Sequence, residues 1–78
     1  IRRYLIMKLE AYISCLRMFA EQYNTNNDEE VQHRELGKVY GMQIAMSIEQ
    51  YDVKIIWSYV DRSIEGFKIN GQFYACGK

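Results

Sequence analysis

The sequence predicts a mainly helical fold: an antiparallel helical hairpin, a third helical segment and a short C-terminal β-hairpin. Two long segments, residues 1–24 and 28–51, carry apolar residues at helical spacing. Only a short run of Asn, Thr and Asp separates them, and the 78 residues include no proline. Because a short loop between two long helices makes them antiparallel neighbours, we expect a hairpin within one domain, residues 1–78.

The first helix is predicted over residues 1–24. Its main apolar stripe recurs at alternating spacings of three and four, as in a heptad seam: Leu5, Leu9, Tyr12, Leu16, Phe19 and Tyr23. A second, weaker apolar stripe lies on another side: Met7, Ala11, Cys15 and Met18. A helix with two such stripes is expected to be covered from two sides.

The segment 24–28, NTNND, is predicted to be the loop of the hairpin, since Asn and Asp favour turns over helix interiors. We predict Asn27 as the N-cap of the second helix, with Glu30 completing a pair that resembles a capping box. The acidic residues Asp28, Glu29 and Glu30 fall where the helix dipole stabilises negative charge. They are therefore interpreted as a helix start and not as an acidic binding site.

The second helix, residues 28–51, places Gly37, Gly41 and Ala45 on one face, because they are spaced four apart. Each glycine inside a helix costs about 1 kcal/mol relative to alanine. We therefore predict close helix–helix packing at these three residues, against the first helix of the hairpin. Nearly opposite this face lies a second apolar stripe: Val31, Val39, Met42 and Met46.

Residues 53–65 carry two conflicting signals. Their β-branched and aromatic composition favours a strand, whereas their apolar residues fall on one side of a helix. We predict a third helix, either continuous with the second or separated from it by a kink near Asp52, ending at Gly66 as a C-cap. The alternative is an α+β fold in which residues 53–76 form a small antiparallel sheet. In either case Asn70-Gly71 predicts a two-residue hairpin turn.

Charge and cysteine content exclude several classes of function. Ten basic and ten acidic residues balance, so nucleic-acid binding is not favoured. No apolar run approaches the roughly 18 residues that a membrane-spanning helix needs. Cys15 and Cys76 are far apart and form no CxxC motif. We expect two reduced thiols in a cytoplasmic protein, with a single disulfide as the open alternative.

Residues able to carry chemistry are few, and we predict neither an enzyme nor a cofactor. His33 is the single histidine. Glu30 and His33 have the Glu-x-x-His spacing of helical di-iron sites, so a helical metal-binding protein is one alternative function. The favoured interpretation is a solvent-exposed histidine near a helix start. Neither cysteine has a sequence context typical of a nucleophile.

A chain of this length buries only about 60–65% of its unfolded surface, so its own core is thin. Doubled apolar stripes and 14% aromatic residues predict a small helical protein–protein interaction module that self-associates, first as a dimer. Such a module would act as an adaptor, or as an inhibitor covering a surface on a protein target. The predicted interface residues are Val39, Met42, Met46, Val53, Trp57, Tyr59 and Val60.

One further alternative is a nucleic-acid-binding or transcription-regulatory domain. It would use the basic start of the first helix, where a dimer pools Arg2, Arg3 and Lys8.

Overall fold

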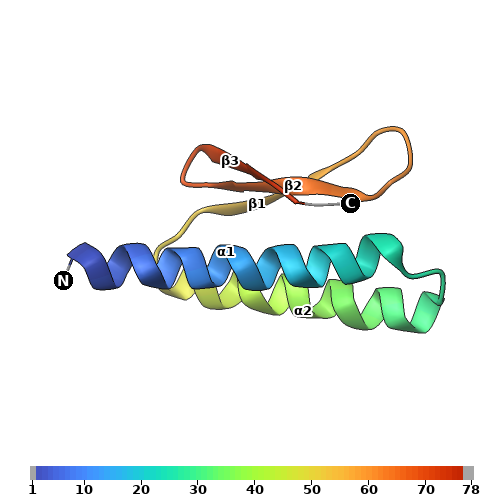
Figure 1. Ribbon diagram of the computed structural model, residues 1–78, viewed down its shortest axis with the longest axis horizontal. Coiled ribbons are helices and arrows are strands. Elements are labelled where there is room, and N and C mark those ends of the chain that lie inside the picture. Colours follow the sequence, from blue (N-terminus) through green and yellow to red (C-terminus); the bar gives the residue numbers. More distant parts are fainter. Residues whose placement is uncertain (1, 77–78) are drawn as a thin grey trace.

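A helical hairpin covered on one side by a three-stranded antiparallel sheet forms the fold (Figure 1). This computed structural model describes the backbone of residues 2–76 and the side chains of residues 7–76. Helices α1 (Arg2–Thr25) and α2 (Glu29–Ile48) lie side by side, and the sheet has the order β1-β2-β3. The strands are β1 (Val53–Trp57), β2 (Ile64–Ile69) and β3 (Gln72–Ala75). The molecule is elongated, with extents of 41 × 22 × 18 Å.

The two helices and the hairpin between them are confirmed, with differences at the ends of α2. Asp28, and not Asn27, is the N-cap: its carboxylate accepts a hydrogen bond from the Glu30 backbone N–H at 3.0 Å. At the other end α2 stops at Ile48, before the predicted residue 51. Gln50 adopts a left-handed conformation, with φ at 71°.

The end of α2 is a Schellman motif. The Tyr51 backbone N–H donates to the Met46 carbonyl, and the Gln50 N–H donates to the Ser47 carbonyl. These bonds satisfy carbonyls that the helix end leaves without partners. The chain therefore turns away from α2 immediately before β1, which breaks the predicted continuity between the second helix and residues 53–65.

The predicted third helix is wrong, and the alternative α+β arrangement fits. Val53–Trp57 and Ile64–Ile69 are strands, and an exposed loop connects them. Gly66 is not a helix C-cap: it lies inside β2, paired with Ile56 on one side and Ala75 on the other. A methyl group added at Gly66 would come within 2.7 Å of the Phe73 ring, so the glycine lets this ring cross the strand.

The predicted hairpin turn at Asn70-Gly71 is confirmed. Both residues have positive φ, 51° and 86°, as a two-residue turn of type I′ requires. Ile69 pairs with Gln72 directly across the turn. The Asn70 side chain also accepts a hydrogen bond from the Asp52 backbone N–H at 2.9 Å, which ties the turn to the start of β1.

The core lies between the hairpin and the inner face of the sheet. Its fully buried side chains come from both layers: Leu16, Ala20, Val39, Met46, Ile64, Phe67 and Ile69. The main stripe of α1 packs here as predicted, from Leu9 to Tyr23. Asn24 joins α1 to the sheet, because its amide group donates to the Ile64 carbonyl and accepts from the Ile64 N–H.

Candidate functional site

The predicted interface residues separate into a buried set and an exposed pair. Val39, Met46 and Val53 are at most 7% exposed and belong to the core of their own chain. Met42 and Trp57 are half-buried and pack against this core. These placements make the prediction wrong for Val39, Met46 and Val53, because the sheet covers the stripe that we had assigned to a partner.

Tyr59 and Val60 are fully exposed in the loop between β1 and β2. Short polar contacts shape this loop: the Ser58 N–H donates to the Ser63 carbonyl at 2.8 Å, and the Ser63 hydroxyl donates to Asp61 at 2.7 Å. The role of Tyr59 and Val60 in an interface stays a prediction.

The predicted close packing at Gly37, Gly41 and Ala45 is wrong for the contact between α1 and α2. All three residues are exposed. Within the described chain, a methyl group added at Gly37 or Gly41 would meet no atom within 4 Å. The two apolar stripes of α2 therefore have the opposite places from those expected: the Val39–Met46 stripe is inside and the glycine stripe is outside.

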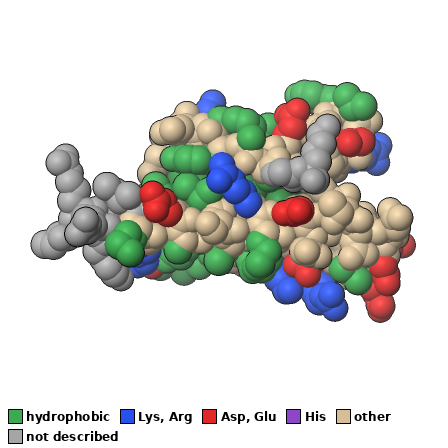
Figure 2. All heavy atoms as spheres, viewed as in Figure 1, with side chains coloured by type: hydrophobic (Ala, Val, Ile, Leu, Met, Phe, Trp, Pro, Cys, Tyr) green, Lys and Arg blue, Asp and Glu red, His purple; other side chains and the backbone are tan. Residues whose placement is uncertain are grey.

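The glycine stripe forms an apolar surface on α2, which we call the exposed α2 face. Its large side chains are well exposed: Tyr40 by 43%, Ile44 by 63% and Ile48 by 79%. The face comprises Gly37, Tyr40, Gly41, Ile44, Ala45 and Ile48. Figure 2 shows hydrophobic side chains at the surface along the hairpin. Because monomeric proteins seldom expose contiguous apolar patches, this face is the strongest candidate for an interaction surface.

A shallow cleft lies beside β1. It has a volume of about 420 Å³, and its lining is mainly apolar: Ile55, Ile56, Trp57, Ser58, Tyr59 and Glu65. Trp57 is held from below by an edge-to-face contact with Tyr23, with ring centroids 5.8 Å apart. The cleft thus combines one edge of the sheet with the exposed loop tip.

A polar cluster joins the first part of α1 to the end of α2. Lys8 forms an ion pair with Glu49 at 2.8 Å, and the Tyr12 hydroxyl donates to the same carboxylate at 2.8 Å. These two hydrogen bonds, that from Lys8 first, lower the pKa of Glu49. The bond to Glu49 raises the pKa of Tyr12. The cluster closes the open end of the hairpin and is a structural contact.

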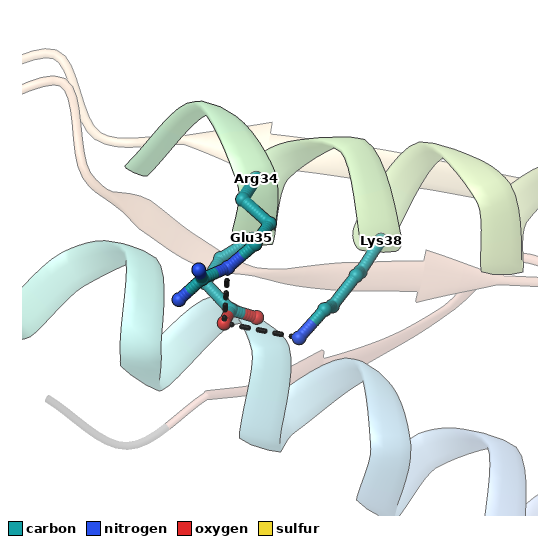
Figure 3. A network of polar contacts seen from close by, with 3 residues as sticks. All are labelled: Arg34, Glu35 and Lys38. Atoms are coloured by element: carbon teal, nitrogen blue, oxygen red, sulfur yellow. Dashed lines mark hydrogen bonds and ion pairs between the residues drawn. The ribbon is translucent and has the colours of Figure 1, made fainter. Parts of the chain in front are cut away.

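Glu35 is the buried charged residue of α2, at 6% exposure. Its carboxylate lies 3.2 Å from the Lys38 ammonium and 3.9 Å from Nε of Arg34, and both partners come from the same helix (Figure 3). The Lys38 ammonium also lies 5.6 Å from the centre of the Phe19 ring on α1. Glu35 is therefore neutralised locally and offers no free carboxylate to a ligand.

The side chains that could bind a metal ion or act as a nucleophile are dispersed over the molecule. Glu30 and His33 are exposed on α2, and the described residues contain no group of three or more His, Cys, Asp or Glu placed to hold a metal ion. Cys15 and Cys76 are both half-buried free thiols. Burial raises the pKa of Cys76, whose thiol donates to the Ile64 carbonyl. A raised pKa disfavours the reactive thiolate.

The predicted basic start of the first helix falls partly outside the described side chains, which exclude Arg2 and Arg3. Lys8, its third member, is engaged with Glu49. No helix in the described part of the chain is long and apolar enough to span a bilayer.

Comparison of the chain with protein-family models, with curated proteins and with solved structures finds no match. The geometry of the exposed surfaces is therefore the basis for a function.

Proposed function

We propose that the protein is a small protein–protein interaction module that self-associates through the exposed α2 face, first as a dimer. The observation that carries the proposal is the exposure of Tyr40, Ile44 and Ile48 along one side of a single helix. The small residues Gly37 and Gly41 between them let a second surface approach the helix backbone closely. An adaptor or an inhibitor that covers a surface on another protein is the activity that fits such a module.

The composition of the face supports a contact with protein. Its large exposed side chains are aromatic and aliphatic, and the charged Arg34 and Lys38 border it. Depletion of charge and enrichment of aromatic residues are typical of the centres of protein interfaces. A nucleic-acid contact, by contrast, needs clustered Lys and Arg to hold phosphates.

The test is sedimentation velocity between about 1 and 200 µM, a range that brackets weak and moderate dimer affinities. We expect a concentration-dependent shift from monomer to dimer. Ile44→Glu should weaken the dimer at least tenfold, because a carboxylate in an apolar interface loses its hydration. Ser14→Glu, at an exposed site on α1, is the matched control and should leave the dimer unchanged. A chain that stays monomeric at the highest concentration would refute the proposal.

A further inference from the structure

We propose that β1 is the strand through which a second copy of this chain docks, so that two sheets join edge to edge into one six-stranded antiparallel sheet. This inference rests on the self-association proposed above and adds to it a surface, a register and a symmetry. The occupant is a second copy, related to the first by a two-fold axis that passes beside Ile55.

The backbone of β1 has a free edge. The sheet order β1-β2-β3 makes β1 and β3 the two edges. In an antiparallel ladder, alternate residues direct their N–H and C=O groups toward a given neighbour. The Asp52 carbonyl accepts from the Asn70 N–H of the turn after β2, so residues 52, 54 and 56 face β2. Val53 and Ile55 therefore direct their backbone groups outward.

The chain covers its edges at two places but not at Ile55. The outward carbonyl of Val53 accepts a hydrogen bond from the Gln43 side chain at 2.7 Å. On the opposite edge, the Ala75 carbonyl of β3 accepts from Nε of Arg17 at 2.9 Å. Within the described part of the chain, no hydrogen bond reaches the outward N–H and C=O of Ile55. An edge with unpaired groups is a template for another strand.

One flank of the exposed α2 face, with Tyr40 and Ile44, lies on the side of this edge. Helix α2 packs beneath β1 and α1 beneath β2. Lys38 and Glu49 mark the side of α2 that faces α1, since they contact Phe19 and Lys8. At 100° per residue, Tyr40 and Ile44 fall on the opposite flank, which is the flank beneath the free edge of β1.

The positions along the two elements also agree. Gln43 is level with Val53 through their hydrogen bond, and β1 runs opposite to α2 (Figure 1). Two strand residues span about 7 Å, which corresponds to four or five helix residues. Ile55 is therefore level with residues 38–39, within one helical turn of Tyr40, so a two-fold axis beside Ile55 brings the Tyr40 side chains of two copies near each other.

The side chains of the strand are compatible with self-pairing in this register, and the Val53 carbonyl exchanges its hydrogen bond from Gln43 for one from the N–H of residue 57 of the second copy. Ile55 meets Ile55 of the second copy, and each donates its N–H to the other's carbonyl. Val53 then lies opposite Trp57, and Lys54 lies opposite Ile56. No like charges face each other across the new strand pair, a juxtaposition that would oppose pairing.

The accessible surface of this monomer exceeds that of a compact monomer by about the area that each partner buries in a standard dimer interface. A compact monomer of 9.3 kDa exposes about 5,000 Å², whereas this chain exposes 5745 Å². The excess, roughly 750 Å², is close to the share of about 800 Å² per partner in a standard interface. An unrelated strand on the edge of β1 would leave the α2 flank uncovered, whereas a second copy covers both.

The test is a register-specific disulfide. Lys54→Cys and Ile56→Cys are prepared as separate variants, both with Cys15→Ser and Cys76→Ser. Three samples are oxidised with glutathione disulfide: each variant by itself, and the two variants mixed. In the proposed register, residue 54 of one copy lies about 4.5 Å from residue 56 of the other, between Cα atoms. That separation permits a disulfide. Identical residues lie diagonally at about 7–8 Å, which is too far.

We expect at least ten times more covalent dimer in the mixture than in either variant alone. Equal or negligible amounts in all three samples would overturn the edge-to-edge proposal. Sedimentation of the same unoxidised chains distinguishes the two proposals. A dimer without the mixed crosslink overturns only the β1 register and leaves self-association standing, whereas a monomer at 200 µM overturns both.

Discussion

The Asn24 side chain forms the two hydrogen bonds to the backbone of Ile64 that a neighbouring strand would form. Its removal should destabilise the protein severely. Its amide accepts from the Ile64 N–H at 2.8 Å and donates to the Ile64 carbonyl at 2.9 Å. In Asn24→Ala, the carbonyl keeps its contact with Cys76, but the half-buried N–H loses its acceptor. An unsatisfied donor costs about 1–3 kcal/mol and a lost bond about 0.5–1.5 kcal/mol. We therefore expect a loss of about 2–3 kcal/mol.

Such a loss is a large fraction of the roughly 4–12 kcal/mol available to 78 residues. It should lower the melting temperature by about 10–20 °C. Urea unfolding followed by circular dichroism and by the fluorescence of Trp57 measures it. Asn27→Ala, in the exposed loop, is the control. Asn24→Asp keeps the acceptor but directs a carboxylate oxygen at the Ile64 carbonyl, so it should also destabilise at neutral pH. If Asn24→Ala unfolds within about 0.5 kcal/mol of the control, the strand-like role is refuted.

Three further predictions use the same unfolding assay. Gly66→Ala should lower the free energy of unfolding by about 2–3 kcal/mol, because its methyl group overlaps a carbonyl oxygen at 2.5 Å and an aromatic ring. Gly41→Ala, in open space, should raise it by about 0.5–1 kcal/mol. Equal effects of the two substitutions would contradict both placements. Gln50→Gly should stabilise by up to about 1 kcal/mol, since φ at this position is 71°; a loss would show that the Gln50 side chain contributes contacts. The pKa of Glu49 is lowered in the folded state, so the stabilisation by its carboxylate is present above the unfolded pKa near 4.5 and is lost as the pH falls through the folded value. Glu49→Gln should therefore lose less stability on acidification than the parent. Parallel profiles of stability against pH would refute the role of the Lys8 contact.

The helices were predictable because their signals extend over 20 residues or more. The stripe that faces inward on α2 was not, because this helix carries apolar residues on opposite sides and both sets fit helical spacing. Periodicity identifies a stripe but does not choose between two. The sheet makes the choice: Val39 and Met46 are covered by strands, and the face with Gly41 is left outside.

The helix predicted over residues 53–65 is wrong because an apolar residue on the outer face of the sheet, Ile56, disguises the strand. Consecutive apolar residues at Ile55 and Ile56 interrupt the alternation that a half-buried strand should show. The register of β1 against β2 shifts between Ile56 and Trp57. The extra residue is Glu65 of β2, and β1 itself keeps its alternation, because Val53, Ile55 and Trp57 pack against the core whereas Ile56 does not. Val60 completed an apparent helical stripe, although it belongs to the exposed loop.

The candidate interaction surface combines residues that are separated in sequence, and this explains why it escaped prediction. Ile55 and Tyr40 lie on one side of the molecule only because the Schellman turn reverses the chain after α2 and sends β1 back along it. Cover of the remaining apolar face by a partner stays a prediction. The chain's own sheet covers the stripe assigned to a partner, and the stripe assigned to α1 is exposed. The interface that the sequence predicts at Val39 and Met46 is therefore proposed for the opposite side of the same helix, next to the outer edge of β1.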